Sequence, residues 1–136
     1  MEKLSVIVPC FNEQETLQDY YDAISKVRET LLGKECELQV ILVDDGSKDK
    51  TLAKMKELSG QCSWIRYISF TRNFGKEAAI YAGLTHAEGE YVSLMDVDLQ
   101  DPPELLPKMY EMVKSGICDS VATRRSDRTG EPVIRS

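Results

Sequence analysis

Short apolar runs alternate along the chain with stretches in which apolar residues recur every three or four positions. The runs are rich in Val and Ile and predict β-strands at residues 4–8, 38–43, 65–70, 91–95 and 119–123. The stretches between them predict amphipathic helices, with apolar positions at 17–31, 52–58, 79–87 and 105–113. Asn12 is expected to cap the first helix, with Glu15 at its third position, and Gly33 to end it.

Regular alternation of strands and helices is typical of the α/β class. We therefore expect a doubly wound, mainly parallel sheet with helices on both faces. Residues 1–125 would form one domain, followed by a polar tail over residues 126–136. Because such sheets bind ligands beyond the carboxyl ends of their strands, the loops that follow the strands are the places to search for function.

Composition narrows the class of protein. The 136 residues are 42% hydrophobic and carry a formal net charge of -6, which argues against nucleic-acid binding through general basicity. No apolar run approaches the roughly 18 residues of a membrane span, so we expect a cytoplasmic protein. The four cysteines lack a CxxC spacing and His86 is the only histidine, which argues against a zinc site.

Paired carboxylates follow the predicted strand at residues 91–95. Asp96 and Asp98 stand two positions apart, so on an extended backbone they would point to the same side, about 6.6 Å apart. A hard cation such as Mg²⁺ or Mn²⁺ would relieve their repulsion, and Gln100 would add a neutral oxygen. The alternative is that acids here only cap the next helix, which suits Asp101.

A second acidic turn follows the strand at residues 38–43 and reads Asp44-Asp45-Gly46-Ser47. Gly46 permits a tight turn, and Ser47 is expected to cap the helix that follows. One carboxylate would accept the imide N–H of a uracil or the donors of a guanine. A turn that serves structure alone is the alternative.

Four motifs, in this order, resemble glycosyltransferase family 2. They are Val8-Pro9-Cys10-Phe11-Asn12-Glu13, Val43-Asp44-Asp45-Gly46-Ser47, Arg72-Asn73-Phe74-Gly75-Lys76 and the run from Met95-Asp96-Val97-Asp98-Leu99-Gln100 through Asp101-Pro102-Pro103-Glu104. The subgroup that the chain resembles most holds the dolichyl-phosphate mannose synthases and bactoprenol glucosyltransferases. The resemblance covers residues 4–125 and implies the Rossmann-like GT-A fold of nucleotide-diphospho-sugar transferases.

The resemblance implies roles for individual residues. The nucleotide pocket would be lined by Pro9, Phe11, Glu13, Asp44, Asp45, Arg72, Lys76 and Asp96. Within it, Asp45 would read the base and Asp44 would support the turn, while Arg72 has the alternative of a structural ion pair. The metal ligands would be Asp96, Asp98 and Gln100, and the catalytic residues Asp96, Asp98 and Arg124.

The implied activity is transfer of a sugar from a nucleotide-diphospho-sugar by metal-assisted inverting displacement. A UDP-sugar is the favoured donor and GDP-mannose the second candidate. The acceptor would be a polyprenyl phosphate or a cell-envelope glycan. A divalent cation and basic residues would stabilise the charge that develops on the departing diphosphate.

The family's catalytic domains continue past the position of Ser136. The resemblance therefore implies the amino-terminal part of a longer protein, associated with the cytoplasmic face of a membrane. We expect this part to bind donor without transferring sugar. The family places a later strand beside residues 91–95, so we also expect that edge to be covered by self-association or by the strand at 119–123 moving inward.

Two other protein classes remain open at this point. A phosphoacceptor receiver domain has a similar length and alternation, but its acidic pair follows the first strand and a Lys-Pro follows the fifth. Here residues 9–13 and Arg124-Arg125 occupy those places. The second class is a catalytically silent nucleotide-binding or interaction module, which would have the same loops but catalyse no reaction.

Overall fold

The computed structural model describes residues 1–100, 102–116, 120–123 and 132–135. In chain order the elements are β1 (Glu2–Cys10), α1 (Leu17–Gly33), β2 (Cys36–Asp44), α2 (Thr51–Gln61), β3 (Ile65–Ser69), α3 (Lys76–His86), β4 (Tyr91–Leu94), the short helical turn η1 (Pro103–Leu105), α4 (Leu106–Lys114), β5 (Ser120–Thr123) and β6 (Pro132–Arg135). The predicted alternation is confirmed from β1 to α4.

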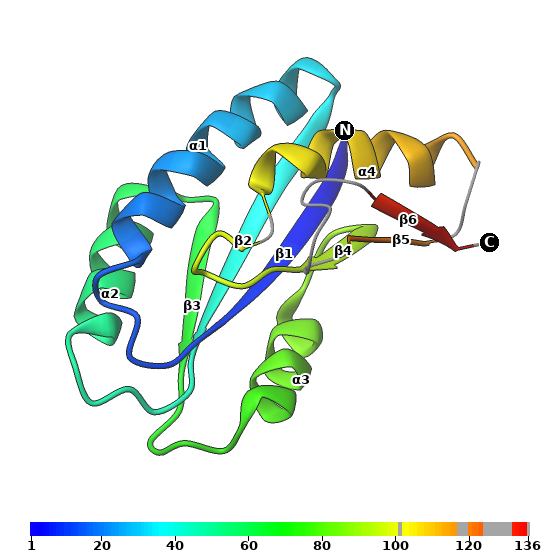
Figure 1. Ribbon diagram of the computed structural model, residues 1–136. Coiled ribbons are helices and arrows are strands. Elements are labelled where there is room, and N and C mark those ends of the chain that lie inside the picture. The colour runs from blue at the N-terminus through cyan, green and yellow to red at the C-terminus, as the bar shows by residue number, and fades with distance from the viewer. Residues whose placement is uncertain (101, 117–119, 124–131, 136) are drawn as a thin grey trace.

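The main sheet has the strand order β3-β2-β1-β4, and all of its pairings are parallel. The chain moves outward from β1 through β2 to β3 and then returns to the other side of β1 as β4 (Figure 1). This reversal between β1 and β4 is the topological switch point at which parallel α/β sheets open a crevice. The predicted α/β class is confirmed.

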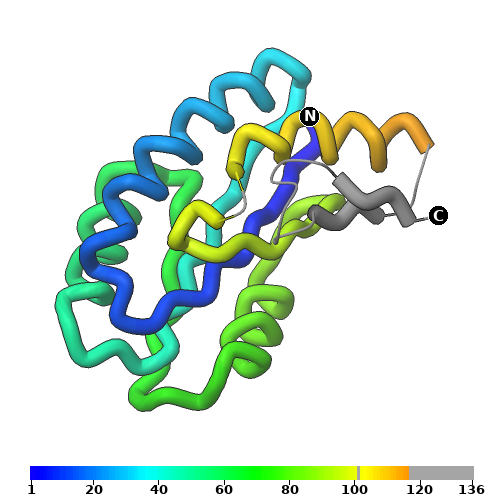
Figure 2. Tube along the Cα trace, in the orientation of Figure 1, coloured from blue at the N-terminus to red at the C-terminus, as the bar shows by residue number. Residues whose placement is uncertain are grey.

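Two apolar layers hold the sheet between its helices. One layer packs α1, α2 and α4 against alternate residues of the central strands, such as Val6 and Val8, and the other packs α3 against Ile7 and Ile41. Along the Cα trace, α1 and α4 lie on one side of β1 and α3 on the other (Figure 2). Because β1 and β2 are covered on both faces, their sequences are almost continuously apolar.

The fifth strand departs from the prediction. β5 pairs antiparallel with β6 in a separate two-stranded sheet, so the prediction of a fifth parallel strand is wrong. β6 lies within residues 126–136, where no strand was expected. An apolar run predicts a strand but does not choose its partner, and a partner nearby in the chain costs less loop-closure entropy.

The start of α1 also departs from the prediction, whereas its end at Gly33 is confirmed. The residue before the helix is Thr16, which makes no side-chain capping hydrogen bond. Asn12 lies four positions earlier with a φ of 52°, and its side chain accepts a hydrogen bond from Lys48 N–H at 2.9 Å. Its side chain therefore serves a neighbouring loop instead of the helix.

β4 forms one edge of the four-stranded sheet. Its Val92 and Leu94 side chains are 44% and 50% exposed, and self-association over this edge stays a prediction.

Across the described ranges, no helix combines the length and apolar character needed to cross a membrane.

Gly83 on α3 lies close against the sheet, because a Cβ at this position would lie 2.4 Å from Ile7 Cγ2. We expect Gly83→Ala to lower the free energy of unfolding by about 1–3 kcal/mol, since the added methyl group overpacks the layer. Gly60→Ala is the matched control on α2, where nothing lies within 4 Å of the added Cβ. The control should be neutral or stabilising by up to about 1 kcal/mol. Urea unfolding compares the two, and equal stabilities would contradict the expectation.

Candidate functional site

The loops that follow β1, β2, β3 and β4 meet at the carboxyl edge of the sheet. Cys10 at the end of β1 is level with Asp44, and Asp44 is level with Ser69 at the end of β3. β4 ends lower, with Leu94 opposite Ile7. The loop after β4 therefore begins beside the last residues of β1, at the switch point.

Hydrogen bonds join the loop after β1 to the loop after β2. Asn12 N–H donates to Ser47 Oγ at 2.8 Å, and Glu13 N–H donates to Thr51 Oγ1 at 2.8 Å. The predicted cap by Ser47 is wrong, because α2 begins at Thr51 after Lys50, and the carboxylate that accepts from Thr51 N–H, at 2.9 Å, is that of Asp49. Both hydroxyl groups instead fix the position of the first loop.

Asp44 and Asp45 are buried, with exposed fractions of 2% and 5%. The Asp44 carboxylate accepts a hydrogen bond from Ser47 N–H at 2.9 Å, which agrees with its predicted support of the turn. The Asp45 carboxylate accepts from Phe74 N–H at 2.8 Å and from Gly75 N–H at 3.2 Å. Asp45 therefore holds the loop after β3, and its predicted role in reading a base stays a prediction.

Gly46 lets these two loops pack directly on each other. It has a φ of 74°, and a Cβ on it would lie 2.3 Å from the carbonyl carbon of Arg72 and 2.4 Å from Asn73 N. The Asn73 side-chain amide also donates to the Asp45 carbonyl oxygen at 3.2 Å. A larger residue at Gly46 would have to push the loops apart.

Arg72 and Phe74 form an exposed pair on the loop after β3. The guanidinium carbon of Arg72 lies 4.5 Å from the centre of the Phe74 ring, and Phe74 meets Phe70 edge to face at 5.6 Å. Within the described part of the chain Arg72 makes no ion pair, so the structural ion pair considered for it is not found there. The sequence analysis assigned no role to Phe74, which is 51% exposed. The feature that could have pointed to it is its position as an aromatic residue in a polar loop.

The loop after β4 begins after Leu94, turns at residues 97–98 and has a φ of 63° at Leu99. The strand assumed for Asp96 and Asp98 ends before them, so their placement on the same side stays a prediction. Asp96 Oδ1 lies 3.0 Å from the ammonium group of Lys76. Asp98 Oδ1 accepts a hydrogen bond from Gln100 N–H at 3.2 Å.

The remaining predicted residues lie around these loops. Pro9 is half-buried near the end of β1 and Phe11 is 44% exposed. Glu13 accepts a hydrogen bond from the Thr16 hydroxyl at 2.8 Å. Arg124 lies outside the described residues. The pocket roles of Pro9, Phe11 and Glu13 and the catalytic role of Arg124 stay predictions.

The donor atoms of the loop after β4 suit a cation that is shared with a ligand. No group of three His, Cys, Asp or Glu side chains that could hold a metal occurs among the residues described. Asp96, Asp98 and Gln100 offer two carboxylates and one amide oxygen. Mg²⁺ is commonly held by one or two carboxylates together with substrate phosphates, so these residues fit a cation bound jointly with a diphosphate.

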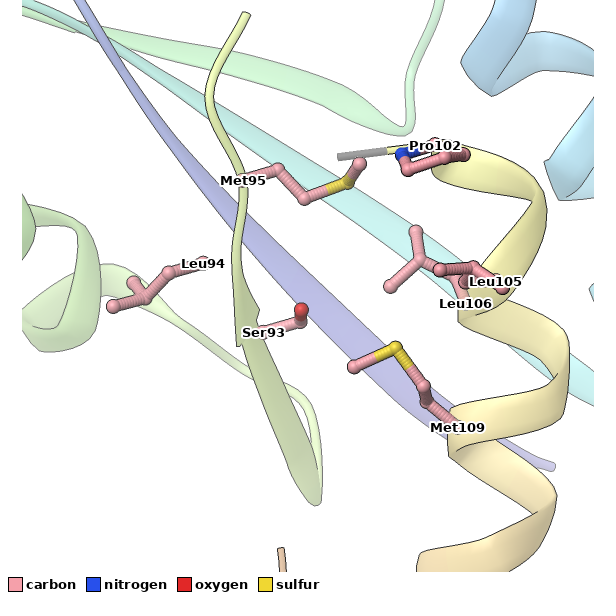
Figure 3. Close-up of a pocket in the computed structure, with 7 residues that line it drawn as sticks. All are labelled: Ser93, Leu94, Met95, Pro102, Leu105, Leu106 and Met109. Carbon is pink, nitrogen blue, oxygen red and sulfur yellow. The ribbon is translucent and has the colours of Figure 1, made fainter. Parts of the chain in front are cut away.

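A small apolar cavity lies between β4 and α4, directly before Asp96. It has a volume of about 30 Å³ and is lined by Ser93, Leu94, Met95, Pro102, Leu105, Leu106 and Met109. Figure 3 shows Ser93 and Met95 directed toward α4 and Leu94 directed away from it. The space holds about one water-sized group, so it is a packing gap next to the site.

Cys10 is the thiol closest in sequence to the first loop. Burial raises the pKa of this thiol, and the carboxylates of Glu13 and Asp44 raise it further. A buried thiol of this kind is inert as a nucleophile. The chemistry of the edge is therefore that of carboxylates and basic side chains.

Comparison with known proteins identifies the family. The model of glycosyl transferase family 2 matches residues 5–135. The bactoprenol glucosyl transferase of Shigella phage SfV is 42% identical over 93% of the chain and 40% of its own length. A prophage bactoprenol glucosyl transferase homolog of Escherichia coli is 41% identical over the same shares. The chain belongs to glycosyltransferase family 2, and it spans about two fifths of the length of these relatives.

Solved structures support the GT-A fold. The mannosyltransferase PcManGT from Pyrobaculum calidifontis, solved in complex with GDP-Man and Mn²⁺, has a TM-score of 0.69 and 25% identity over 82% of this chain and 32% of its own. TarS 1-349 of S. aureus, solved in complex with UDP-GlcNAc, has a TM-score of 0.65 and 24% identity over 86% of this chain and 32% of its own. Family membership removes the receiver-domain alternative.

The hydrogen bonds of Asp45 generate a prediction about the loop after β3. Asp45→Asn removes the charge that Phe74 N–H and Gly75 N–H face, so we expect a loss of about 1–2 kcal/mol in unfolding free energy. Amide hydrogen exchange at Phe74 and Gly75 should also become faster. Asp22→Asn, at an exposed position of α1, is the control. Unchanged exchange at both amides would show that Asp45 does not hold this loop.

Proposed function

We propose that this member of glycosyltransferase family 2 binds a nucleotide-diphospho-sugar at the carboxyl edge of its sheet and serves transfer of the sugar to a polyprenyl phosphate. The observation that carries the proposal is the meeting of four ordered loops at the switch point, with Lys76 and Asp96 paired across it at 3.0 Å. Similarity to bactoprenol glucosyl transferases over 93% of the chain supports the acceptor class.

The basic and acidic side chains of the site would divide the work on the donor. Arg72 and Lys76 would face the diphosphate and offset its negative charge. Asp96, Asp98 and Gln100 would hold Mg²⁺ or Mn²⁺, which supplies Lewis-acid stabilisation of the departing diphosphate. Mn²⁺ and GDP-Man in the structure of PcManGT support this assignment.

The nucleoside would lie against the loops after β1 and β2. Phe11 and Pro9 offer apolar surface beside the buried Asp45. Within the residues that the structure describes, its Oδ2 accepts only from Gly75 N–H and keeps a further lone pair for a base N–H. We favour a UDP-sugar, and glucose in particular, because the relatives at 41–42% identity are named glucosyl transferases. GDP-mannose is the second candidate.

The chemistry of the acceptor fits a site built from these groups. A phosphate monoester has a second pKa of about 6 and is anionic at neutral pH, so it attacks without a general base. Its oxygen would form a bond to the anomeric carbon while the bond from that carbon to the diphosphate oxygen breaks. Attack opposite the leaving group inverts the configuration at that carbon.

Nucleotide binding should depend on a divalent cation through Asp98. In calorimetric titrations with Mn²⁺, we expect Asp98→Asn to weaken UDP binding by at least about tenfold. Loss of a metal ligand should cost no less than loss of a residue that only hydrogen-bonds a ligand and orients it. Without Mn²⁺ the variant and the unchanged protein should bind UDP equally. Asp22→Asn serves as the charge-matched control. Wild-type affinity that is insensitive to Mn²⁺ would contradict the metal assignment.

Transfer is tested with the full-length protein, a polyprenyl monophosphate and labelled donors. We expect labelled polyprenyl phosphoglucose from UDP-glucose and little product from GDP-mannose. Thermal shifts should rank the donors in the same order, since a ligand at 100 times its dissociation constant stabilises by about 2.7 kcal/mol. Donor binding without any transfer would instead favour a catalytically silent nucleotide-binding module.

A further inference from the structure

Lys76 stands at a position that disfavours a cation. It is the first residue of α3, directly after Gly75, where the helix dipole presents partial positive charge. Its ammonium group finds a counter-charge in another loop, at Asp96 Oδ1, 3.0 Å away. The pair links the helix on one face of the sheet to the loop after β4.

The two residues of this ion pair have different partners in the proposed function, one the diphosphate and the other the metal ion. Lys76 faces the proposed diphosphate, and Asp96 belongs to the proposed metal ligands. An ammonium group and a divalent cation are both attracted to the same carboxylate and repel each other. The Lys76 side chain is 59% exposed and that of Asp96 is 21% exposed, so the pair is screened by water and exchanges at low cost.

We propose that Lys76 is a positioning residue that changes partners during donor binding. Without donor its ammonium group neutralises Asp96. When Asp96 takes up the cation together with the nucleotide, Lys76 releases the carboxylate and pairs with the diphosphate. The proposal rests on the proposed function. It implies that the divalent cation binds the protein weakly by itself and strongly together with the nucleotide.

Simpler roles for Lys76 give different results. A lysine that only contacts phosphate would affect nucleotide affinity and leave the affinity for Mn²⁺ alone unchanged. A lysine that only braces the loop after β4 would help both ligands, so its removal would weaken both. If Lys76 exchanges partners, removal of its ammonium group has opposite effects: Mn²⁺ alone binds more tightly and the nucleotide binds more weakly.

Lys76→Gln tests these roles, with Mn²⁺ alone and UDP as the probes. Electron paramagnetic resonance of free Mn²⁺ measures metal affinity, and calorimetry at saturating Mn²⁺ measures UDP affinity. We expect Mn²⁺ alone to bind about two- to fivefold more tightly, as expected for removal of an exposed competing ion pair. UDP should bind about tenfold more weakly, because a charge-assisted hydrogen bond is lost.

Two further variants serve as controls. Lys76→Arg keeps the charge and should hold Mn²⁺ affinity near that of the unchanged protein. Lys56→Gln removes an equal charge from an exposed position on α2 and should change neither affinity. Unchanged or weaker Mn²⁺ binding in Lys76→Gln would overturn the exchange while the proposed function stands. Failure of the unchanged protein to bind UDP with Mn²⁺ would overturn both.

Discussion

A carboxylate buried at the end of a strand must be hydrogen-bonded, and this requirement governs the candidate site. Asp45 is 5% exposed, and its oxygens are satisfied by the backbone amides of Phe74 and Gly75. An unsatisfied charge at this depth would cost several kcal/mol. The loop after β3 is therefore held where it supplies those amides, and Gly46 gives it room to do so.

The same rule acts at the opposite end of the sheet. The buried Ser5 hydroxyl donates to the Gln39 side chain at 2.6 Å and accepts from Gly89 N–H at 2.9 Å, while Gln39 also accepts from Glu88 N–H at 3.0 Å. These bonds fasten the connection from α3 to β4 beneath β1 and β2. They help to place β4 beside β1, and with it the loop that carries Asp96.

The sequence predicted what depends on periodicity and missed what depends on contacts between loops. Apolar runs located the four parallel strands, and strand direction placed the acidic and basic loops at one edge. The capping predictions for Asn12 and Ser47 were wrong because these polar groups bond across loops, where local propensity has no influence. The partner of β5 and the path of the chain past Leu94 likewise depend on tertiary structure.

The contacts around Lys76 explain how its ammonium group is stabilised at this edge of the sheet before any ligand binds. Asp45 binds the amides of the two residues that precede it, which places anionic charge near the start of α3 and offsets the unfavourable position of the lysine in the helix dipole. Asp96 supplies the second anion from the other side of the switch point. Because one acid comes from the loop after β2 and the other from the loop after β4, the position of the ammonium group depends on both halves of the sheet. A ligand that alters the charge at Asp96 therefore also alters the forces on the loop that Asp45 holds.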